Sequence, residues 1–385
     1  MNIGFILFDY FPFGGLQRDC VKIAGHCVEH GHRVTLFTRT WQGERPVGVE
    51  VEILGRRGFT NISRNRHLLK QLQTMLPQRK LDGIAGFNKM PGLDVYYGAD
   101  PCYIARIART KPTWHSWLPR HRHYAGLERS VFAPGAPTQI LLIAPHEKAV
   151  YQKIYGTEER FHFLPPNAAR RSFTEAQRLE LRDKIRRDNG WPLDEKIVLH
   201  VGSDFRRKGV DRAILSLAAL PDLLGQQTRL VILGQGDPAR FMRLAGSLSV
   251  ADRVHFLGGR LDAPDWMLAA DFMVHPAYSE NTGTTLVEAL ASGLPVLATD
   301  VCGFSFHVAN AQAGIVLPSP FDQTACDREF AGMLESDCET KRRANALAYA
   351  AREDIYGCHE RAAEIIEQTI RRKLEAQTRV SGSAS

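Results

Sequence analysis

The sequence has few cysteines and no long hydrophobic run. Seven cysteines are scattered over 385 residues, and none is spaced as C-x-x-C. An odd, scattered set does not suit a disulfide framework, and the spacing does not suit a zinc site. The longest apolar runs, such as Ile140–Pro145, fall far short of the ~20 residues that a membrane-spanning helix needs. We therefore expect free thiols, no metal and no membrane-spanning helix.

Two further signals are missing near the start of the chain. Met1–Leu7 is short, soon gives way to polar residues and lacks a basic leading segment. It does not look like a signal peptide, so we expect a cytoplasmic protein. The first glycine pair, Gly14 and Gly15, is not part of a G-x-G-x-x-G pattern. That absence disfavours a dinucleotide-dependent enzyme.

Acidic residues are sparse in the first part of the chain. Residues 1–165 contain 22 Lys and Arg against 13 Asp and Glu, whereas the remainder contains 27 against 29. Much of the excess falls in residues 56–89 and 106–129, and the second stretch includes Trp114, Trp117 and Tyr124. A basic, aromatic surface suits nucleic acid, an anionic membrane or a phosphorylated substrate. A solvated face without a partner is equally compatible with the charge alone.

The length and the periodicity predict two α/β domains. Short β-branched runs alternate with amphipathic stretches, as in Asn2–Phe8, Gly15–His30 and Arg33–Thr38, and this order returns from Ile197 onward. Alternation of this kind predicts two doubly wound parallel sheets. Further expected elements are helices over 210–220, 239–247 and 284–292, and strands over 197–202, 228–234, 254–257, 272–275 and 296–298.

The predicted domain boundary is at Pro165 and Pro166, because two successive prolines exclude both a helix and a central strand. We expect a domain over residues 1–165 and a second over 166–350. A final helix over about 351–373 could cross back onto the first domain. The tail, residues 374–385, ends in Ser and Gly and is expected to be disordered.

Three polar segments follow predicted strands, where α/β proteins bind ligands. Gly14-Gly15 would let the backbone approach a phosphate, although a plain tight turn explains them too. Arg206-Arg207-Lys208 could neutralise a diphosphate. In the third segment, Glu280 lies in a polar loop and Glu288 within the helix that follows, where a solvated helix position remains an alternative.

The third segment carries a family resemblance. Glu280 and Glu288 match the E-x7-E pattern of retaining GT-B glycosyltransferases, and the run through Gly293-Leu294-Pro295-Val296 resembles glycosyltransferase family 4. Other segments resemble the lipopolysaccharide core glucosyltransferases of that family and together span nearly the whole chain: residues 10–19, 86–96, 122–125, 201–205 and 207–212. The resemblance implies a GT-B fold of two Rossmann-like domains facing a central cleft. It implies an acceptor-binding first domain and a nucleotide-sugar-binding second domain.

The resemblance also implies an activity: retaining transfer of a hexose from a UDP-sugar to an inner-core heptose of lipopolysaccharide, without metal or other cofactor. Glucose is the family's usual sugar, with galactose or an N-acetylhexosamine as alternatives. The donor would be bound by Gly14, Gly15, Arg207, Lys208, Asn281, Thr282, Gly283, Thr284, Thr285, Leu286 and Glu288. Arg207 and Lys208 would stabilise the departing UDP, and Glu288 would hold the ribose.

The catalytic candidates are Glu280 and Asp100. Glu280 would lie beside the donor sugar, as a binding residue or a nucleophile. Asp100 would orient or deprotonate the acceptor hydroxyl, but its place before Pro101 suits a turn equally well. Asp19 and Lys89 would lie on the acceptor side. Ser203 stands where most family members have Arg, and we expect Arg207 to supply that charge.

Two alternatives stay open at this stage. One is a UDP-sugar 2-epimerase of the same fold, and the other is a non-catalytic membrane or nucleic-acid binding module built on the basic first domain. Under the main hypothesis no nucleic acid is expected as a partner. The cationic domain would instead attract the anionic inner leaflet, so that the protein is peripheral on the cytoplasmic face of the inner membrane.

Overall fold

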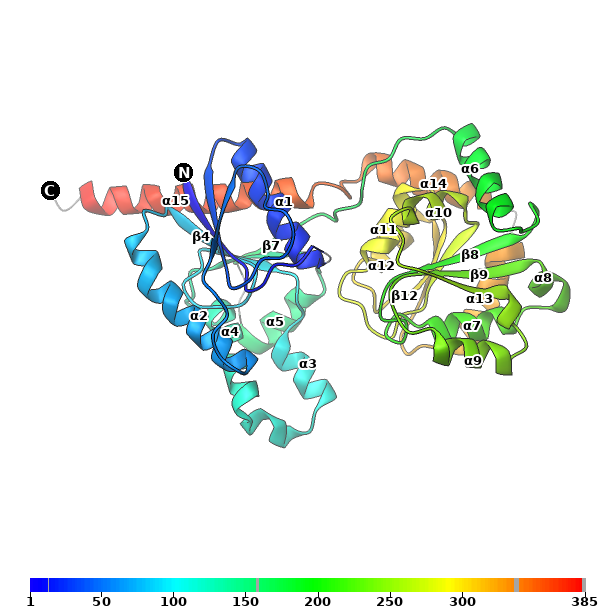
Figure 1. The fold of residues 1–385 in the computed structure, drawn as a ribbon, viewed down its shortest axis with the longest axis horizontal. Helices are drawn as coiled ribbons and strands as arrows, with labels where there is room; N and C mark the ends of the chain where they lie inside the picture. Colours follow the sequence, from blue (N-terminus) through cyan, green and yellow to red (C-terminus); the bar gives the residue numbers. More distant parts are fainter. Residues whose placement is uncertain (13, 157–158, 336–338, 383–385) are drawn as a thin grey trace. The chain divides into compact units, whose positions relative to one another are not determined.

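The computed structural model describes the chain except residues 13, 157–158, 336–338 and 383–385. It divides into two compact units (Figure 1). Unit 1 consists of Met1–Pro165 and Gly357–Ser385, and unit 2 of Pro166–Tyr356. The division after Pro165 falls where the two prolines predict it, and the second unit extends six residues beyond the expected 350.

Unit 1 contains a seven-stranded sheet whose paired strands are all parallel, in the order β3-β2-β1-β4-β5-β6-β7. Its strands are β1 (Asn2–Ile6), β2 (Arg33–Thr38), β3 (Val49–Ile53), β4 (Gly83–Gly86), β5 (Val95–Gly98), β6 (Gln139–Leu142) and β7 (Phe161–Phe163). The order reverses direction between β1 and β4. Such a reversal opens a crevice at the carboxyl ends of the strands, which is the usual ligand position in this class of sheet.

Helices cover both faces of this sheet. They are α1 (Gly15–Glu29), α2 (Asn61–Met75), α3 (Tyr103–Thr110), α4 (Pro119–Phe132), α5 (Glu147–Tyr155) and α15 (Cys358–Gly382), with the short 3-10 helices η1 (Leu76–Gln78) and η2 (Thr113–Trp117). One core packs β1, β2 and β4 against α1 and α15. The other packs the opposite face against α2, α4 and α5. Burial on both faces explains the continuous hydrophobic runs of the strands.

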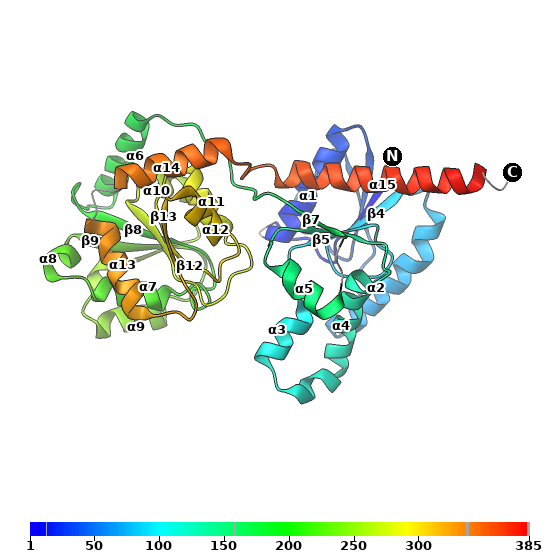
Figure 2. The ribbon, with the colours of Figure 1, turned by 180° about the vertical axis from the view of Figure 1, so that it is seen from behind.

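The last helix lies along α1, as both views show (Figure 2). The predicted helix from 351 to 373 is wrong at both ends: α14 (Glu339–Arg352) stops first, a loop follows, and α15 begins at Cys358. Residues 374–382 continue the helix, contrary to the expected disorder. Lys373 lies 2.9 Å from Asp94 and Leu374 packs against the core of unit 1, so the helix is held to that unit at its predicted end and one residue beyond it.

Unit 2 contains a six-stranded sheet, again with parallel pairing throughout, in the order β10-β9-β8-β11-β12-β13. Its strands are β8 (Lys196–Val201), β9 (Thr228–Leu233), β10 (Val254–Gly258), β11 (Phe272–His275), β12 (Val296–Thr299) and β13 (Gly314–Leu317). The first five correspond to the predicted strands, and β13 was not anticipated. Here the order reverses between β8 and β11, which places the loops after these two strands at the ligand position.

The helices of unit 2 form two layers. Those named from the structure are α6 (Glu175–Asp188), α7 (Val210–Ala218), α8 (Asp222–Gln226), α9 (Ala239–Ser247), α10 (Ala263–Ala269), α11 (Thr284–Ala291), α12 (Ser305–Ala311), α13 (Gln323–Glu335) and α14, with η3 (Ala251–Arg253). One core joins the sheet to α7, α9 and α13. The other joins it to α6, α10, α11, α12 and α14.

The cysteines of the described residues are buried and form no disulfide with one another: Cys20, Cys27, Cys102, Cys302, Cys326 and Cys358. Cys338 lies outside the described residues. In the same part of the chain, no cluster of three or more His, Cys, Asp or Glu has the arrangement of a metal site. The helices described there also include none with the length and apolar character needed to span a bilayer.

Candidate active site

The loop between β8 and α7 is fitted closely to the loop after β11. Gly209 precedes α7 with a φ of +77°, and a Cβ at this position would lie 2.0 Å from the carbonyl oxygen of Pro276. Only glycine combines that backbone angle with that approach. The Tyr278 amide donates to the Arg207 carbonyl at 2.9 Å. The two loops are therefore held side by side within unit 2.

This arrangement of the two loops places the Lys208 and Arg207 side chains in contact with the Glu280 carboxylate. The Lys208 ammonium forms an ion pair with the Glu280 carboxylate, and Arg207 Nη1 lies 3.2 Å from Glu280 Oε2. Arg207 also donates to the Ser279 carbonyl at 3.0 Å and, through Nε, to Asp204 Oδ2 at 3.0 Å. The lysine and the glutamate are almost buried, whereas the Arg207 side chain is 40% exposed. Two predicted donor residues thus meet the predicted catalytic carboxylate.

The electrostatics of this cluster favour an anionic ligand. Burial, together with the Arg207 guanidinium beside it, lowers the pKa of the Lys208 ammonium to about 8. The Glu280 carboxylate opposes this, because an adjacent negative charge favours the ammonium. Lys208 and Arg207 therefore share the buried Glu280 carboxylate, and Arg207 also pairs with the exposed Asp204. A phosphate at this point could accept charge-assisted hydrogen bonds from both cations.

Two neutral imidazoles lie behind the cluster. His275, at the end of β11, is fully buried, and its Nε2 is 3.9 Å from Glu280 Oε2. Burial, together with Lys208, holds the pKa of His275 well below its usual value. His200 stacks on it at 5.5 Å and shares a hydrogen bond of 2.9 Å with the Val274 carbonyl. Burial lowers the pKa of His200 to about 4. These uncharged rings add no competing positive charge beside Lys208.

The helix that follows Glu280 directs amides toward the same edge of the sheet. Gly283 caps α11 with a φ of +80°, and no side chain caps the helix start. The Thr284 and Thr285 amides belong to the first turn, which has no intrahelical acceptor and carries the positive end of the helix dipole. Leu286 was also expected to bind the donor. Its amide instead donates to the Gly283 carbonyl at 2.9 Å, and its side chain is in the core.

The other donor residues predicted from the third segment flank the helix start. The Asn281 amide donates to Glu280 Oε1 at 3.2 Å, and the Thr282 carbonyl accepts from the Phe304 amide at 2.7 Å. The backbone of Glu280 forms an isolated parallel β-bridge with that of Cys302. Glu288 lies one turn into α11 and is half-buried. Its position on the helix is therefore compatible with contact to a ligand.

Ser203 has a local structural task. Its hydroxyl accepts a hydrogen bond from the Gln235 amide at 3.1 Å. This contact joins the loop after β8 to the loop after β9. Arg207, four residues later, contacts Glu280; that it supplies the charge of the missing Arg stays a prediction.

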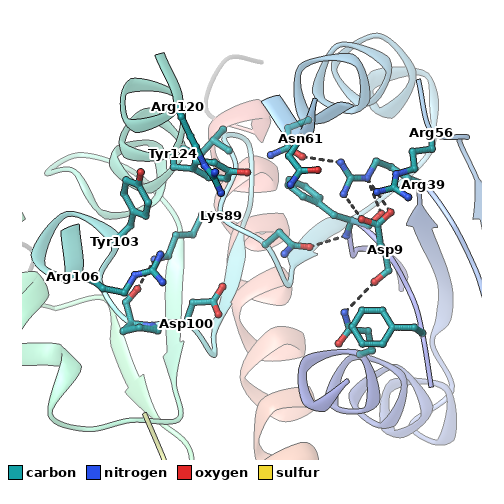
Figure 3. A pocket seen from close by; sticks show the side chains of 17 residues that line it. Asp9, Arg39, Arg56, Asn61, Lys89, Asp100, Tyr103, Arg106, Arg120 and Tyr124 are labelled. Atoms are coloured by element: carbon teal, nitrogen blue, oxygen red, sulfur yellow. Dashed lines mark hydrogen bonds and ion pairs between the residues drawn. The ribbon is translucent and has the colours of Figure 1, made fainter. Parts of the chain in front are cut away.

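Unit 1 contains a pocket of about 520 Å³ at the carboxyl ends of its strands (Figure 3). The side chains around it are polar, charged and aromatic: Phe8, Asp9, Phe11, Gln17, Arg39, Arg56, Asn61, Asn65, Asn88, Lys89, Asp100, Pro101, Tyr103, Arg106, Arg120, Tyr124 and Leu127. The first of these residues, Phe8, and the last, Leu127, are 119 positions apart in the sequence. The pocket lies where the reversal between β1 and β4 predicts a ligand.

Asp100 and Lys89 both line this pocket but differ in their partners. Asp100 follows β5 and is exposed, and its carbonyl accepts from the Tyr151 hydroxyl at 3.3 Å. Lys89 lies 2.6 Å from the carboxylate of Glu128, which is completely buried, and donates to the Pro101 carbonyl at 3.1 Å. Lys89 is thus committed to an internal ion pair, whereas the Asp100 carboxylate is directed into the pocket.

Glu128 organises this side of the pocket. Its carboxylate accepts from the Tyr103 amide at 2.6 Å and the Ile104 amide at 3.2 Å, which begin α3. Burial alone would raise the pKa of Glu128, but Lys89 and these amides outweigh it and hold the pKa below its usual value. Sequence analysis did not single out Glu128. An acidic residue in a strongly basic helix was the available signal.

The remaining predicted residues of unit 1 lie near α1. Gly14 caps the helix, and a Cβ there would lie 1.9 Å from Gln17 Oε1, whereas a Cβ on Gly15 would meet nothing within 4 Å. Asp19 lies inside the unit, where its carboxylate accepts from the Tyr97 hydroxyl at 2.9 Å and contacts His359 Nε2 at 2.8 Å. Asp19 therefore ties α1 to the start of α15 and is not one of the pocket-lining residues.

Comparison with known proteins identifies the family. A family model described as "Glycosyl transferases group 1" matches residues 182–354. The "Lipopolysaccharide glucosyltransferase WaaG" of Escherichia coli (strain K12) is 41% identical over 369 residues, which are 95% of this chain and 98% of the relative. The chain belongs to the group 1 glycosyl transferases. The resemblance drawn from Glu280, Glu288 and the flanking segments is confirmed.

Solved structures place this glycosyl transferase in the GT-B fold. The "Crystal Structure of WaaG, a glycosyltransferase involved in lipopolysaccharide biosynthesis" superposes with a TM-score of 0.85 at 40% identity, covering 94% of this chain and 99% of that one. Anabaena Alr3699/HepE, solved in complex with UDP and glucose, has a TM-score of 0.73 at 18% identity, with 96% and 100% covered. This second likeness concerns the fold alone. The predicted two-sheet GT-B architecture is confirmed.

Proposed function

We propose that this glycosyl transferase moves glucose from UDP-glucose to a heptose of the lipopolysaccharide inner core, with retention at the anomeric carbon. The cluster of Lys208, Arg207 and Glu280 beside the start of α11 carries the proposal, because it places two cationic side chains and the first amides of a helix at one edge of the sheet. The 41% identity with the lipopolysaccharide glucosyltransferase WaaG over nearly the whole length supports this choice of donor and acceptor.

The cluster suits stabilisation of a leaving diphosphate. Transfer breaks the bond between the sugar's anomeric carbon and the diphosphate, and negative charge develops on the departing UDP. Fixed cations and helix amides placed at that point lower the barrier without reorganisation. Arg207 and Lys208 would supply this charge, assisted by the amides of Thr284 and Thr285. In this proposal no divalent cation is needed, so that excess EDTA leaves the rate unchanged.

Glu280 is proposed to bind the donor and to hold the two cations in place. Its carboxylate is paired with both Lys208 and Arg207. Such pairing stabilises the negative charge and makes the oxygen a weaker nucleophile. A double displacement through Glu280 is therefore disfavoured relative to attack on the same face of the sugar. Glu288 is proposed to hold the ribose hydroxyls.

The acceptor is proposed to bind in the pocket of unit 1. Asp100 presents a carboxylate there without a counter-ion among the described residues, as a group that removes a proton from the attacking hydroxyl should. The bond from the acceptor oxygen to the anomeric carbon forms as its proton passes to Asp100. UDP leaves with the electrons of the broken bond.

Unit 1 is also proposed to associate with the cytoplasmic face of the inner membrane. The segment α3-η2-α4 projects from the body of unit 1 (Figure 1). Trp114 and Trp117 are 56% and 74% exposed, and basic side chains flank them on both helices. Exposed indole rings and cations are the groups that bind an anionic bilayer surface. Vesicles rich in anionic lipid should bind the protein and release it at high salt, whereas equal binding to neutral vesicles would contradict this.

A donor panel tests the proposed function. The full chain is incubated with heptose-terminated lipopolysaccharide and UDP-glucose, UDP-galactose or UDP-N-acetylglucosamine, and released UDP is measured. UDP-glucose should give the fastest release, with a product one hexose heavier and of retained anomeric configuration. Reactions without acceptor detect an epimerase by the appearance of a second UDP-sugar. A folded protein that is inert with every donor overturns the proposal.

A further inference from the structure

The charges around the pocket of unit 1 do not balance. Five cationic side chains line it, against the carboxylates of Asp9 and Asp100. Two of the cations have internal partners: Arg39 pairs with Asp9 and contacts Asn65 at 2.8 Å, and Lys89 pairs with Glu128. The three left over are Arg56, Arg106 and Arg120. Among the described residues none of these three has an ion pair or a hydrogen bond from its guanidinium group.

Two of the three arginines are held by aromatic rings. The Arg106 guanidinium lies 5.7 Å from the centre of the Tyr103 ring, and that of Arg120 lies 6.0 Å from the centre of the Tyr124 ring. The two tyrosine rings are themselves 5.6 Å apart. Contact through the ring face positions a guanidinium while leaving its N–H groups free to donate. One side of the pocket therefore presents oriented donors without acceptors.

Arg56 lies on the other side of the pocket. Figure 3 shows it beside Arg39 and Asn61, opposite the side that carries Arg106 and Arg120. A ligand in the pocket would therefore meet unpaired guanidinium groups on both sides. Guanidinium groups bind phosphate and carboxylate oxygens in pairs of parallel hydrogen bonds, and tyrosine rings offer apolar faces to a sugar.

We propose that this pocket recognises an anionic saccharide, through Arg56, Arg106 and Arg120 acting on a phosphate or carboxylate group of the acceptor. The proposal rests on the proposed function, since it takes the acceptor to be a saccharide, and it adds that a negative group near the accepting sugar is required for affinity. The positive charge of unit 1 then has a local role in substrate selection, distinct from attraction to a membrane surface.

The sequence provides a matched control for each arginine. Arg57 follows Arg56, Arg109 lies one turn after Arg106 on α3, and Arg122 lies two residues after Arg120 on α4. All three are exposed, and the pocket-lining set does not include them. Substituting either member of a pair removes the same charge from nearly the same place. Only the pocket members should matter if recognition is local.

The test is equilibrium binding by calorimetry with the full chain and a deacylated, heptose-terminated core oligosaccharide. Three forms of this probe are used: untreated, phosphatase-treated and carboxyl-reduced. Arg56→Gln, Arg106→Gln and Arg120→Gln should each weaken binding of the untreated form by roughly fivefold to tenfold, as expected for charged hydrogen bonds that are partly exposed. Arg57→Gln, Arg109→Gln and Arg122→Gln should stay within about twofold.

The treated probes identify the anion. One of the two treatments should weaken binding to the wild type and abolish the difference between the wild type and the pocket variants. The group that this treatment removes is the one that the pocket recognises. UDP binding, measured in parallel, should not change in any variant. Equal losses in pocket and control variants, equal affinity for all three probe forms, or no measurable binding at low salt would each overturn the inference. If this pattern holds but no donor supports transfer, the proposed function fails while the anion site stands.

Discussion

Lys208 and Glu280 form an ion pair in which the two side chains are only 11% and 10% exposed. They come from the loops after β8 and β11, 72 residues apart. A buried pair of this kind costs desolvation on both sides, and removing one partner leaves the other charge uncompensated. Under the proposed function, the pair keeps a cation at the point where the leaving group forms.

Lys208→Met should lower both activity and stability. Loss of the cation removes stabilisation of the departing diphosphate, and we expect kcat with UDP-glucose to fall by roughly a hundredfold or more. The unpaired Glu280 should also reduce the free energy of unfolding by about 3 kcal/mol. Steady-state UDP release and urea unfolding measure the two effects.

The double variant Lys208→Met with Glu280→Gln separates these effects. Neither position then carries a buried charge. The urea concentration at the unfolding midpoint should therefore return most of the way to the wild-type value, while activity stays low. Recovery of activity in the double variant would show that Lys208 has only a structural role.

Asp100→Asn should affect the chemical step alone. The amide is close in size and keeps the backbone contact to Tyr151, but it cannot accept the proton of the attacking hydroxyl. We expect kcat to fall by roughly 10²-fold or more, with an unchanged dissociation constant for UDP. A wild-type rate in the variant would leave Asp100 as a turn residue.

Glu288→Gln should weaken nucleotide binding. If Glu288 holds the ribose, replacing its charge should reduce UDP affinity by roughly tenfold, which is the loss expected for a charged hydrogen bond. Because Glu288 is only half-buried on α11, the thermal midpoint should change little. Calorimetric titration with UDP and with uracil alone gives the contrast, since the base lacks the ribose hydroxyls and should not distinguish the variant from wild type.

Glu128→Gln should destabilise unit 1, with an effect that depends on pH. The native pKa of Glu128 is lower than its ordinary value of 4.5, so its stabilising contribution is complete above about pH 4.5 and is lost as the pH falls through the lower native value. The substitution also leaves Lys89 without its counter-ion. We expect a loss of about 3 kcal/mol at pH 7, and a smaller difference at pH 3, measured by denaturant unfolding.

Unit 2 should lose stability between pH 6.5 and 4. Burial lowers the pKa of His307 to about 4, and its Nδ1 shares a hydrogen bond of 2.7 Å with the Tyr349 hydroxyl. In this pH range His307 is protonated in the unfolded chain but stays neutral in the native state. The free energy of unfolding therefore decreases as the pH falls, by up to about 1.4 kcal/mol per pH unit for one such group. His307→Asn keeps a partner for Tyr349 but does not titrate. It should reduce the slope by the share of one histidine, and an unchanged slope would contradict the assignment.

Local patterns predicted most of the fold because each pattern depends on neighbours in the chain. The periodicity of Ala239–Ser247 gave a helix with the same bounds, and Phe272–His275 gave the strand. The errors lie where an element is stabilised by residues that are far away in the sequence. The helix was expected to end at Lys373 but continues to Gly382. Lys373 pairs with Asp94 and Leu374 packs on the core of unit 1, and no local pattern reveals these contacts.

The candidate site shows the same division. The E-x7-E spacing and the cations at Arg207 and Lys208 were legible in the sequence, whereas Asp19 was expected on the acceptor side and is instead bound to Tyr97 and His359. A carboxylate on α1 has the same local signature in both situations. Its partners, on β5 and α15, decide its role.

The sequence by itself determined the family, the two α/β units and the chemical character of the donor loops, since these depend on residue type and spacing along the chain. Only the tertiary structure decided which charges are neutralised. Lys89 is paired, whereas Arg56, Arg106 and Arg120 have no ion pair within the described part of the chain, although all four belong to the same basic part of the chain. The reason is geometric: an ion pair forms only where the fold brings opposite charges within a few ångströms, and that distance is set by the packing of helices against the sheet.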